Sequence, residues 1–162
     1  MSPALQSPLS KLSAEVSDAG STIPLQSRDT RLRKHADYQR VYKTTRKQFS
    51  ASMTWFVSAR EISPTSNTSA TGIAPAGPRV GLTAGKVLGK AHERNRIKRR
   101  MREVVRRHIA ELPGGVDLVL HPRRSVITME FVKLEAEVLR IFRQAAAQVR
   151  QAKAPDASRP RA

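Results

Sequence analysis

The residues best suited to contact another molecule lie between Arg79 and His108. This stretch contains eleven Lys or Arg and two Glu, so it holds +9 of the chain's formal net charge of +17. Like charges placed this close together repel one another, and an external polyanion would relieve the repulsion. The stretch therefore predicts contact with nucleic acid rather than an ordinary solvated helix surface.

Side chains that could cleave RNA are missing from the chain. A protein ribonuclease needs a pair of His, or His and Glu, as general acid and base, with a cation beside the phosphate. The only histidines are His35, His92, His108 and His121, and none has an evident partner. The basic stretch is also almost without the carboxylates that a two-metal site requires. We therefore expect no catalytic residue and no protein metal site, and we expect the protein to bind while a partner carries the chemistry.

The segment from Gly81 to Val87 invites comparison with a phosphate-binding loop for nucleoside triphosphates. It has three residues between its glycines instead of four, and Val87 stands where Ser or Thr would bind magnesium. We reject a nucleotide cofactor on this basis. Gly85 and Gly89 are more consistent with a backbone that, with Lys86, approaches a phosphate.

Residues 91–108 have the period of an amphipathic helix that holds most of these charges. One apolar stripe recurs every three or four residues, which predicts that this face packs on a core and that His108 is a core residue. The stripe consists of Ile97, Met101, Val104, Val105, His108 and Leu112. The opposite side carries Arg96, Arg99, Arg100, Arg106 and Arg107, with Lys98 and Arg102 on the flank.

The remaining elements follow from periodicity. We predict a helix at 36–43, a strand at 49–58 with alternate residues buried, a loop at 61–78, and strands at 79–84 and 116–120. Thr128 is a candidate cap for a last helix that continues to about residue 145. The order α-β-β-α-β-α predicts an α+β fold, a two-layer sandwich of helices on one small sheet, and antiparallel pairing of the first two strands is the simplest arrangement.

Composition limits the remaining choices. The chain has no cysteine, which excludes disulfides and agrees with a reducing cytoplasm, and no apolar run approaches membrane-spanning length. A pI near 11.5 then favours nucleic acid as the partner. We predict one RNA-binding domain at 28–150, between disordered tails at 1–27 and 151–162.

A longer motif identifies a family. The run Lys86-Val-Leu-Gly89-Lys-Ala91-His-Glu-Arg94-Asn95-Arg96-Ile-Lys98-Arg99-Arg-Met-Arg102-Glu103 resembles the signature of the bacterial ribonuclease P protein component. The likeness covers about residues 31–148. It departs from the family at Val87, where a second lysine is common.

The resemblance implies a function and a set of sites. In that family a partner RNA is the catalyst and uses magnesium, and the protein helps it to hold precursor tRNA for removal of the 5′ leader. The resemblance implies a left-handed βαβ crossover, whereas the general rule predicts a right-handed one. Implied contacts with the catalytic RNA are Arg94, Asn95, Arg96, Lys98, Arg99 and Arg102. Implied residues of a cleft for the single-stranded leader are Tyr38, Tyr42, Phe49 and Lys86.

Other interpretations remain open from the residues alone. The shared helical face of Tyr38, Val41 and Tyr42 favours two ordinary core tyrosines, whereas an exposed ring could stack on a base. A ribosomal or general RNA-binding protein would have the same charge without a leader cleft. A DNA-binding regulator would need a second helix after a short turn, and we find none.

Overall fold

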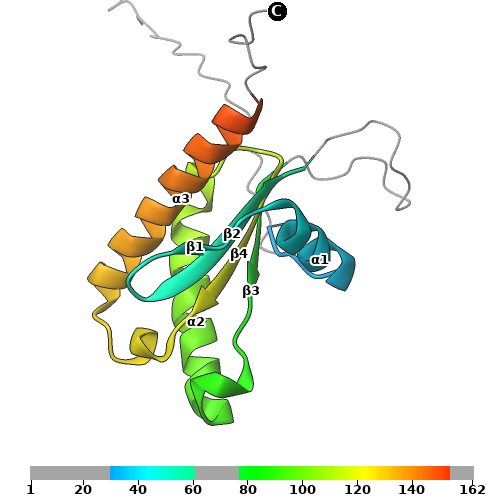
Figure 1. Ribbon diagram of the computed structural model, residues 1–162. Coiled ribbons are helices and arrows are strands. Elements are labelled where there is room, and N and C mark those ends of the chain that lie inside the picture. The colour runs from blue at the N-terminus through cyan, green and yellow to red at the C-terminus, as the bar shows by residue number, and fades with distance from the viewer. Residues whose placement is uncertain (1–29, 61–76, 154–162) are drawn as a thin grey trace, which may run out of the picture.

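The computed structural model describes residues 30–60 and 77–153; the predicted tail at 1–27, most of the predicted loop at 61–78 and the end of the second tail lie outside these ranges. The helices are α1 (His35–Thr44), α2 (Ala91–His108) and α3 (Phe131–Lys153), and the strands are β1 (Gln48–Phe49), β2 (Met53–Ala59), β3 (Arg79–Leu82) and β4 (Val116–Pro122). Short 3-10 helices are η1 (Lys86–Leu88), η2 (Ile109–Glu111) and η3 (Arg124–Ile127). Figure 1 shows α2 and α3 lying along one sheet.

The sheet has the strand order β1-β2-β4-β3. β2 pairs with β4 antiparallel, with Phe56 opposite Val119, and β3 pairs with β4 parallel, with Val80 opposite Leu118. The predicted antiparallel pairing of β2 with β3 is therefore wrong. β4 lies between them because its nearly continuous apolar sequence is best buried as a central strand covered on both faces.

The connection from β3 through α2 to β4 joins two parallel strands. In Figure 1 both strands run downward, α2 lies behind the sheet, and β4 lies to the left of β3. A crossover with this arrangement is left-handed, as the family resemblance implied and against the general rule. It places one flank of α2 next to the outer edge of β3.

The main core lies between the sheet and the two long helices. Ile97, Met101 and Val104 of the predicted stripe are fully buried, and they meet Trp55 of β2 and Phe142 of α3. The predicted α+β class, with helices packed on one small sheet, is confirmed. This cluster contains 17 buried residues and joins α2 and α3 to three strands. It fixes α2 on the sheet, so that the opposite face of this helix is held toward solvent.

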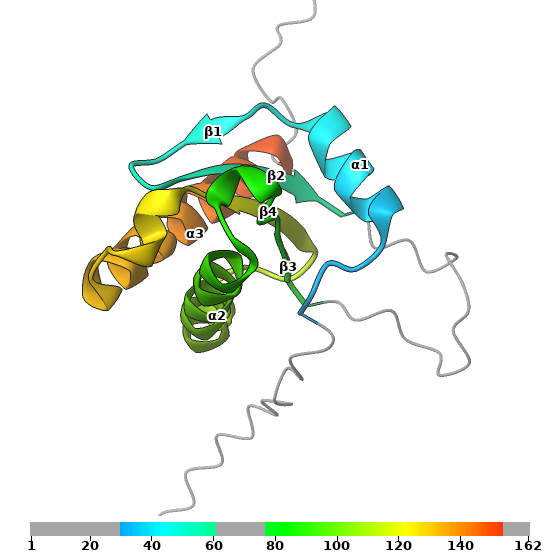
Figure 2. The same cartoon turned by 90° about the horizontal axis from the view of Figure 1, so that it is seen from below.

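α1 covers the opposite face of the sheet, as Figure 2 shows from below. Val41 of α1 packs with Leu32 and Val119, and Tyr38, Tyr42 and Phe56 close around them. Phe56 broke the alternation of the predicted strand because this second face is also covered. Trp55 and Val57 of β2 thus face the main core, whereas Phe56 between them faces the second core under α1.

The predicted strand at 49–58 is in fact two strands joined by a turn. Phe49 is 66% exposed instead of buried, and Ala51 is exposed as well. The reason is the carboxylate of Glu137 on α3, which accepts hydrogen bonds from the Ser52 amide at 2.8 Å, the Ser52 hydroxyl at 2.6 Å and the Ser50 hydroxyl. A buried carboxylate with three donors fixes this turn.

The predicted cap of the last helix is also wrong. α3 begins at Phe131, and Thr128 instead ends η3, with its amide bonded to the Ser125 carbonyl at 3.3 Å. Thr128 also bonds that carbonyl through its hydroxyl at 3.4 Å. The local bond to the preceding turn competes with capping, which is a general property of Thr side chains.

Candidate nucleic-acid interface

α2 begins at a fixed place because of Gly89 and Glu93. Gly89 has φ 117°, and a Cβ there would lie 2.1 Å from Glu93 Oε2. That carboxylate accepts the Lys90 amide at 2.7 Å, which lowers the pKa of Glu93, and it also accepts Arg124 at 2.9 Å. Gly89 is therefore required for the turn itself, a stronger reason than the phosphate approach that its sequence suggested.

One arginine of the basic run serves the fold. Arg100 donates to the Ile127 carbonyl at 2.7 Å and to the Met129 carbonyl. These carbonyls lie at the end of η3 and just before α3, so Arg100 fastens α2 to the connection that leads into α3. In an irregular connection such carbonyls lack regular backbone partners, and here the Arg100 guanidinium donates to them instead.

Two further arginines are paired with carboxylates. Arg106 and Arg107 both bond Glu103, at 2.8 and 2.9 Å, which lowers the pKa of that carboxyl. His108, predicted to be a core residue, is only half-buried and lies with Nε2 2.7 Å from Glu135 Oε1 on α3. The prediction for His108 is wrong because this side of α2 faces a polar residue of α3 rather than apolar ones.

The other cations of α2 remain available to a ligand. Within residues 30–60 and 77–153, no side-chain hydrogen bond or ion pair involves them. An unpaired guanidinium keeps all its donors for a phosphate, which it can grip with two hydrogen bonds. This group, which we call the unpaired cations, consists of Arg94, Arg96, Lys98, Arg99 and Arg102, all exposed or partly exposed; Asn95 among them is exposed.

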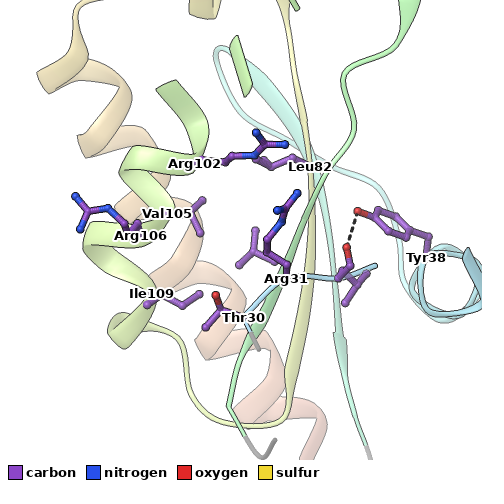
Figure 3. A pocket seen from close by; sticks show the side chains of 10 residues that line it. Thr30, Arg31, Tyr38, Leu82, Arg102, Val105, Arg106 and Ile109 are labelled. Carbon is purple, nitrogen blue, oxygen red and sulfur yellow. Dashed lines mark hydrogen bonds between the residues drawn. The ribbon is translucent and has the colours of Figure 1, made fainter. Parts of the chain in front are cut away.

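The unpaired cations lie on two flanks of α2. Arg94, Lys98 and Arg102 are four residues apart and share the flank next to β3, where Arg102 lines a cavity (Figure 3). Arg96 lies one turn before Arg100 and therefore shares the flank next to η3. All six residues predicted to contact the catalytic RNA thus lie on one helix, spread around its outer half.

The two tyrosines of α1 have different environments. The Tyr38 ring packs on Gly81, where a Cβ would lie 2.7 Å from its hydroxyl oxygen, and that hydroxyl donates to the Leu32 carbonyl at 3.2 Å. Burial raises the pKa of Tyr38, with Tyr42 adding to the rise. Tyr38 is thus a wedge between α1 and β3, with its polar atom already satisfied.

Tyr42 belongs to an aromatic surface made by two other elements. Its ring meets Phe56 edge to face at a centroid distance of 5.0 Å, and its hydroxyl lies 2.9 Å from His121 Nε2. Burial, and then the charge of Lys47, lowers the pKa of His121, so the ring is neutral near pH 7. We call Tyr42, Phe56 and His121 the aromatic surface.

Sequence reasoning missed Phe56 and His121. The signal was present at Phe56, which is apolar where the alternation of β2 calls for a polar residue. His121 directly follows the apolar run of β4 and points to the same face as Phe56, at a ring distance of 5.6 Å. Only the packing of α1 brings these rings together, so the sequence alone could not group them.

Phe49 and Lys86, the other two residues predicted for the leader cleft, lie outside the aromatic surface. Phe49 is exposed on β1, with Lys47 Nζ 5.3 Å from its ring centroid. Lys86 is exposed in η1, and the hydrogen bonds and ring contacts of the described residues do not join it to Tyr42. Lys47 lies over the Phe49 ring, and its charge also lowers the pKa of His121. The sequence did not suggest either role.

A buried charge network holds α1 against the sheet. Asp117 of β4 has a fully buried side chain and pairs with Arg40 at 2.5 Å, Arg60 at 3.0 Å and Arg79 at 2.7 Å. Asp37 of α1 joins the network through Arg40 at 3.1 Å and Arg79 at 3.2 Å. Hydrogen bonds to Asp117 raise the pKa of Arg79. The network therefore sets the position of α1 and of both its tyrosines.

The described residues provide neither a metal site nor a membrane-spanning helix. Residues 30–60 and 77–153 contain no group of three His, Asp or Glu side chains that could hold a metal ion. Within the same ranges, no helix has the length and apolar character that crossing a membrane requires.

The comparison with known families decides the identity. The family model described as "Ribonuclease P" matches residues 26–146, most of the chain. The chain belongs to the ribonuclease P protein family. A protein named "Ribonuclease P protein component" from Chloroflexus aggregans is 37% identical over 119 residues, which cover 73% of this chain and 78% of that one. The protein of the same name from Finegoldia magna is 39% identical over 69 residues, 43% of this chain and 61% of that one.

Solved ribonuclease P proteins have the same fold. A mutant of the Staphylococcus aureus protein with defective mRNA degradation activity has a TM-score of 0.60 and 22% identity, covering 75% of this chain and 92% of that one. The protein from Thermotoga maritima has a TM-score of 0.56 and 22% identity, covering 70% and 96%. The ribonuclease P resemblance is confirmed, while the roles of individual residues stay predictions.

Proposed function

We propose that this protein is the RNA-binding subunit of ribonuclease P, which holds a catalytic RNA and the 5′ leader of precursor tRNA while the leader is removed. The observation that carries the proposal is the set of unpaired cations on α2, the helix that also contains the family motif. Five neighbouring cations without internal carboxylates favour a phosphate backbone over any neutral ligand. Membership of the family supplies the identity of the RNA partner.

The protein contributes binding and not bond cleavage. The histidines with ring contacts or ion pairs, His121 and His108, are engaged with Tyr42 and Glu135 rather than with each other. Such partners suit packing and docking of helices, not proton transfer to a phosphate. We assign magnesium and the hydrolytic chemistry to the RNA partner and place the complex in the cytoplasm, in line with the cysteine-free sequence.

The leader site that we propose is centred on Tyr42. Single-stranded RNA is bound by aromatic rings on which bases stack, beside cations that follow the backbone. Tyr42 and Phe56 supply the rings, and Lys47 supplies a nearby charge. Tyr38, with its hydroxyl satisfied and its ring on Gly81, serves mainly to hold α1, so we narrow the predicted pair of tyrosines to one.

Reconstitution tests this proposal. The highly purified protein, free of RNA, is expected to leave precursor tRNA uncut at any magnesium concentration. Together with the ribonuclease P RNA of a bacterium it should raise the rate of leader removal at low magnesium, where fewer cations screen the repulsion between the two RNAs. Metal-dependent cleavage by the protein alone would contradict the assignment of the chemistry.

A second measurement separates this role from general RNA binding. The tagged protein should copurify with one predominant RNA from cell extract, and the complex should bind leader-bearing precursor more tightly than mature tRNA. Equal recovery of ribosomal and other RNAs, with no preference for the leader, would identify a general RNA-binding protein instead.

A further inference from the structure

A cavity of about 250 Å³ lies between α2 and the outer edge of β3. Its walls come from residues 30–32 before α1, Tyr38 of α1, strand β3, the last two turns of α2 and Ile109 of η2. Figure 3 shows these walls from close by. The lining residues that matter for its chemistry are Arg31, Tyr38, Leu82, Arg102, Val105 and Ile109.

The cavity is lined by arginines, and none of the described residues that line it carries a carboxylate. In Figure 3 the guanidinium groups of Arg31 and Arg102 project into the space between α2 and β3, whereas that of Arg106 points away. Arg106 is engaged with Glu103, at 2.8 Å. Within the described residues neither Arg31 nor Arg102 has an ion pair, so two charged forks converge on one small space.

The floor of the cavity is apolar. Val105 of α2 and Ile109 of η2 line the cavity together with Val80 and Leu82 of β3, and Tyr38 closes the far side with its hydroxyl turned to the Leu32 carbonyl. Such a lining suits a flat apolar body, and the two arginines suit an anion attached to it. Phosphate alone would leave the apolar walls in contact with water.

Size and position restrict the ligand further. The volume lies below the roughly 300 to 1,000 Å³ that is common for drug-sized ligands, so it admits one ring system rather than several. Arg102 is the last of the three unpaired cations on the β3 flank of α2, after Arg94 and Lys98. The cavity is therefore continuous with the surface to which we assign the RNA backbone.

We propose that this cavity receives one unpaired nucleotide of the partner RNA, with its base against Val105 and Leu82 and its phosphate between Arg31 and Arg102. The inference rests on the proposed function, since it takes the bound RNA as the source of the nucleotide. Flipped or unstacked bases are the parts of an RNA that proteins read individually, and the arginine fork holds the adjoining phosphate. The aromatic surface around Tyr42 is a separate site for the leader.

The first experiment uses the full chain and three small probes. Methyl resonances of Val80, Leu82, Val105 and Ile109 are followed by NMR while adenosine 5′-monophosphate, adenosine or ribose 5-phosphate is added. We expect saturable shifts of these methyl groups with adenosine 5′-monophosphate and much smaller ones with either part alone. Equal shifts with ribose 5-phosphate would show a simple phosphate contact, and absence of shifts at these methyl groups would overturn the site.

The second experiment compares two neighbouring cations. Arg31→Gln removes a charge that lines the cavity, and Arg33→Gln removes an exposed charge that does not. We expect the first to weaken binding of the partner RNA about tenfold, equal to about 1.4 kcal/mol, and the second to weaken it no more than about twofold, the loss of one general phosphate attraction. Equal losses would overturn the cavity proposal.

A third variant fills the space without changing charge. Val105→Phe should reduce affinity for the partner RNA, while Val132→Phe, the same change at an exposed position of α3, should not. If Val105→Phe lowers folding stability, the comparison of Arg31 with Arg33 decides. Loss of affinity for precursor alone would assign the nucleotide to the substrate and contradict the partner RNA as its source.

These outcomes are separate from failure of the proposed function. If the unaltered protein binds the partner RNA and assists leader removal, but Arg31→Gln behaves as Arg33→Gln, only the cavity proposal is wrong. If the unaltered protein does neither, the proposed function is wrong, whatever the small probes show.

Discussion

Two groups of arginines in this protein have opposite surroundings. Arg40, Arg60 and Arg79 converge on the buried carboxylate of Asp117, whereas the cations of α2 have few carboxylates near them, and five have no partner among residues 30–60 and 77–153. The same residue type thus builds the fold in one region and is left for a ligand in the other. What distinguishes the two is the supply of acidic side chains, not the density of positive charge.

The boundary between the groups runs through α2 itself. Arg100 bonds two carbonyls beside α3, and Arg106 and Arg107 share Glu103, although all three belong to the basic run. A count of charges along α2 would therefore overestimate the surface that is available to RNA. The number of phosphates that the protein neutralises should follow the unpaired cations.

The largest expected effect is at Asp117. Asp117→Asn removes the buried carboxylate that three guanidinium groups share, and Asp37 still pairs with Arg40 and Arg79, so the free energy of unfolding should fall by about 3 to 5 kcal/mol. Urea unfolding measures this change. The exposed carboxylate of Glu103 provides the contrast: Glu103→Gln should hardly change unfolding and should leave RNA affinity equal or higher, because it releases Arg106 and Arg107. A similar stability loss in both variants would remove the distinction between the two groups.

The next effect separates the two tyrosines that the Asp117 network positions. Tyr38→Ala should lower the free energy of unfolding by about 3 kcal/mol, as for truncation of other packed aromatic residues, and leave the ratio of precursor to mature tRNA affinity unchanged. Tyr42→Ala should reduce that ratio, because the precursor alone should lose the binding free energy of a stacked base, about 1 to 3 kcal/mol. Affinities of the folded variants for both RNAs are the measurement. An unchanged ratio for Tyr42→Ala would leave the leader site without support.

A smaller effect compares unpaired with paired cations of α2. The double variant Arg96→Gln, Arg99→Gln should make the negative slope of log K against log salt shallower by about 1.4 to 1.8. Each lost phosphate contact removes about 0.7 to 0.9 from the magnitude of that slope. Arg106→Gln, Arg107→Gln removes the same charge from side chains that Glu103 already engages, so its slope should change less. Filter binding over a range of salt gives both slopes, and equal slopes would show that internal pairing does not matter.

The smallest effect is a pH dependence at His121. Its pKa is lowered in the folded state by burial and by Lys47, so on acidification the unfolded chain takes up this proton first. Stability from this group is therefore complete above the unfolded pKa of about 6.5 and is lost as the pH falls below it. NMR titration of His121, with urea unfolding of the protein and of His121→Gln at neutral and mildly acidic pH, measures the effect. A normal pKa would place the ring in water and outside the aromatic surface.

Much of the helical structure could be predicted from the sequence. α2 has the predicted bounds because its apolar stripe is regular and its other side is charged, a pattern that specifies a helix without tertiary information. The set of unpaired cations likewise agrees with the motif that indicated the family. These features are local, so local sequence suffices for them.

The pairing of the strands and the second face of the sheet could not be predicted. β4 comes between β2 and β3 although it follows both in sequence, and no local pattern encodes that order. Phe56 and His121 depend on the same order and on α1. Asp117 gave a signal of its own, a carboxylate within an apolar strand that must be paired, but its partners are 38 to 77 residues away.

The central position of β4 has a consequence for synthesis of the chain. β2 and β3 both pair with β4 and not with each other, so they cannot join one sheet before β4 has been made. A nascent chain that has reached the end of α2 therefore carries its cations without a sheet on which Ile97 and Met101 can pack. Contacts between such distant segments cost loop-closure entropy and form slowly, so we expect α2 to reach its final position only when residues 116–122 have been made and have entered the sheet.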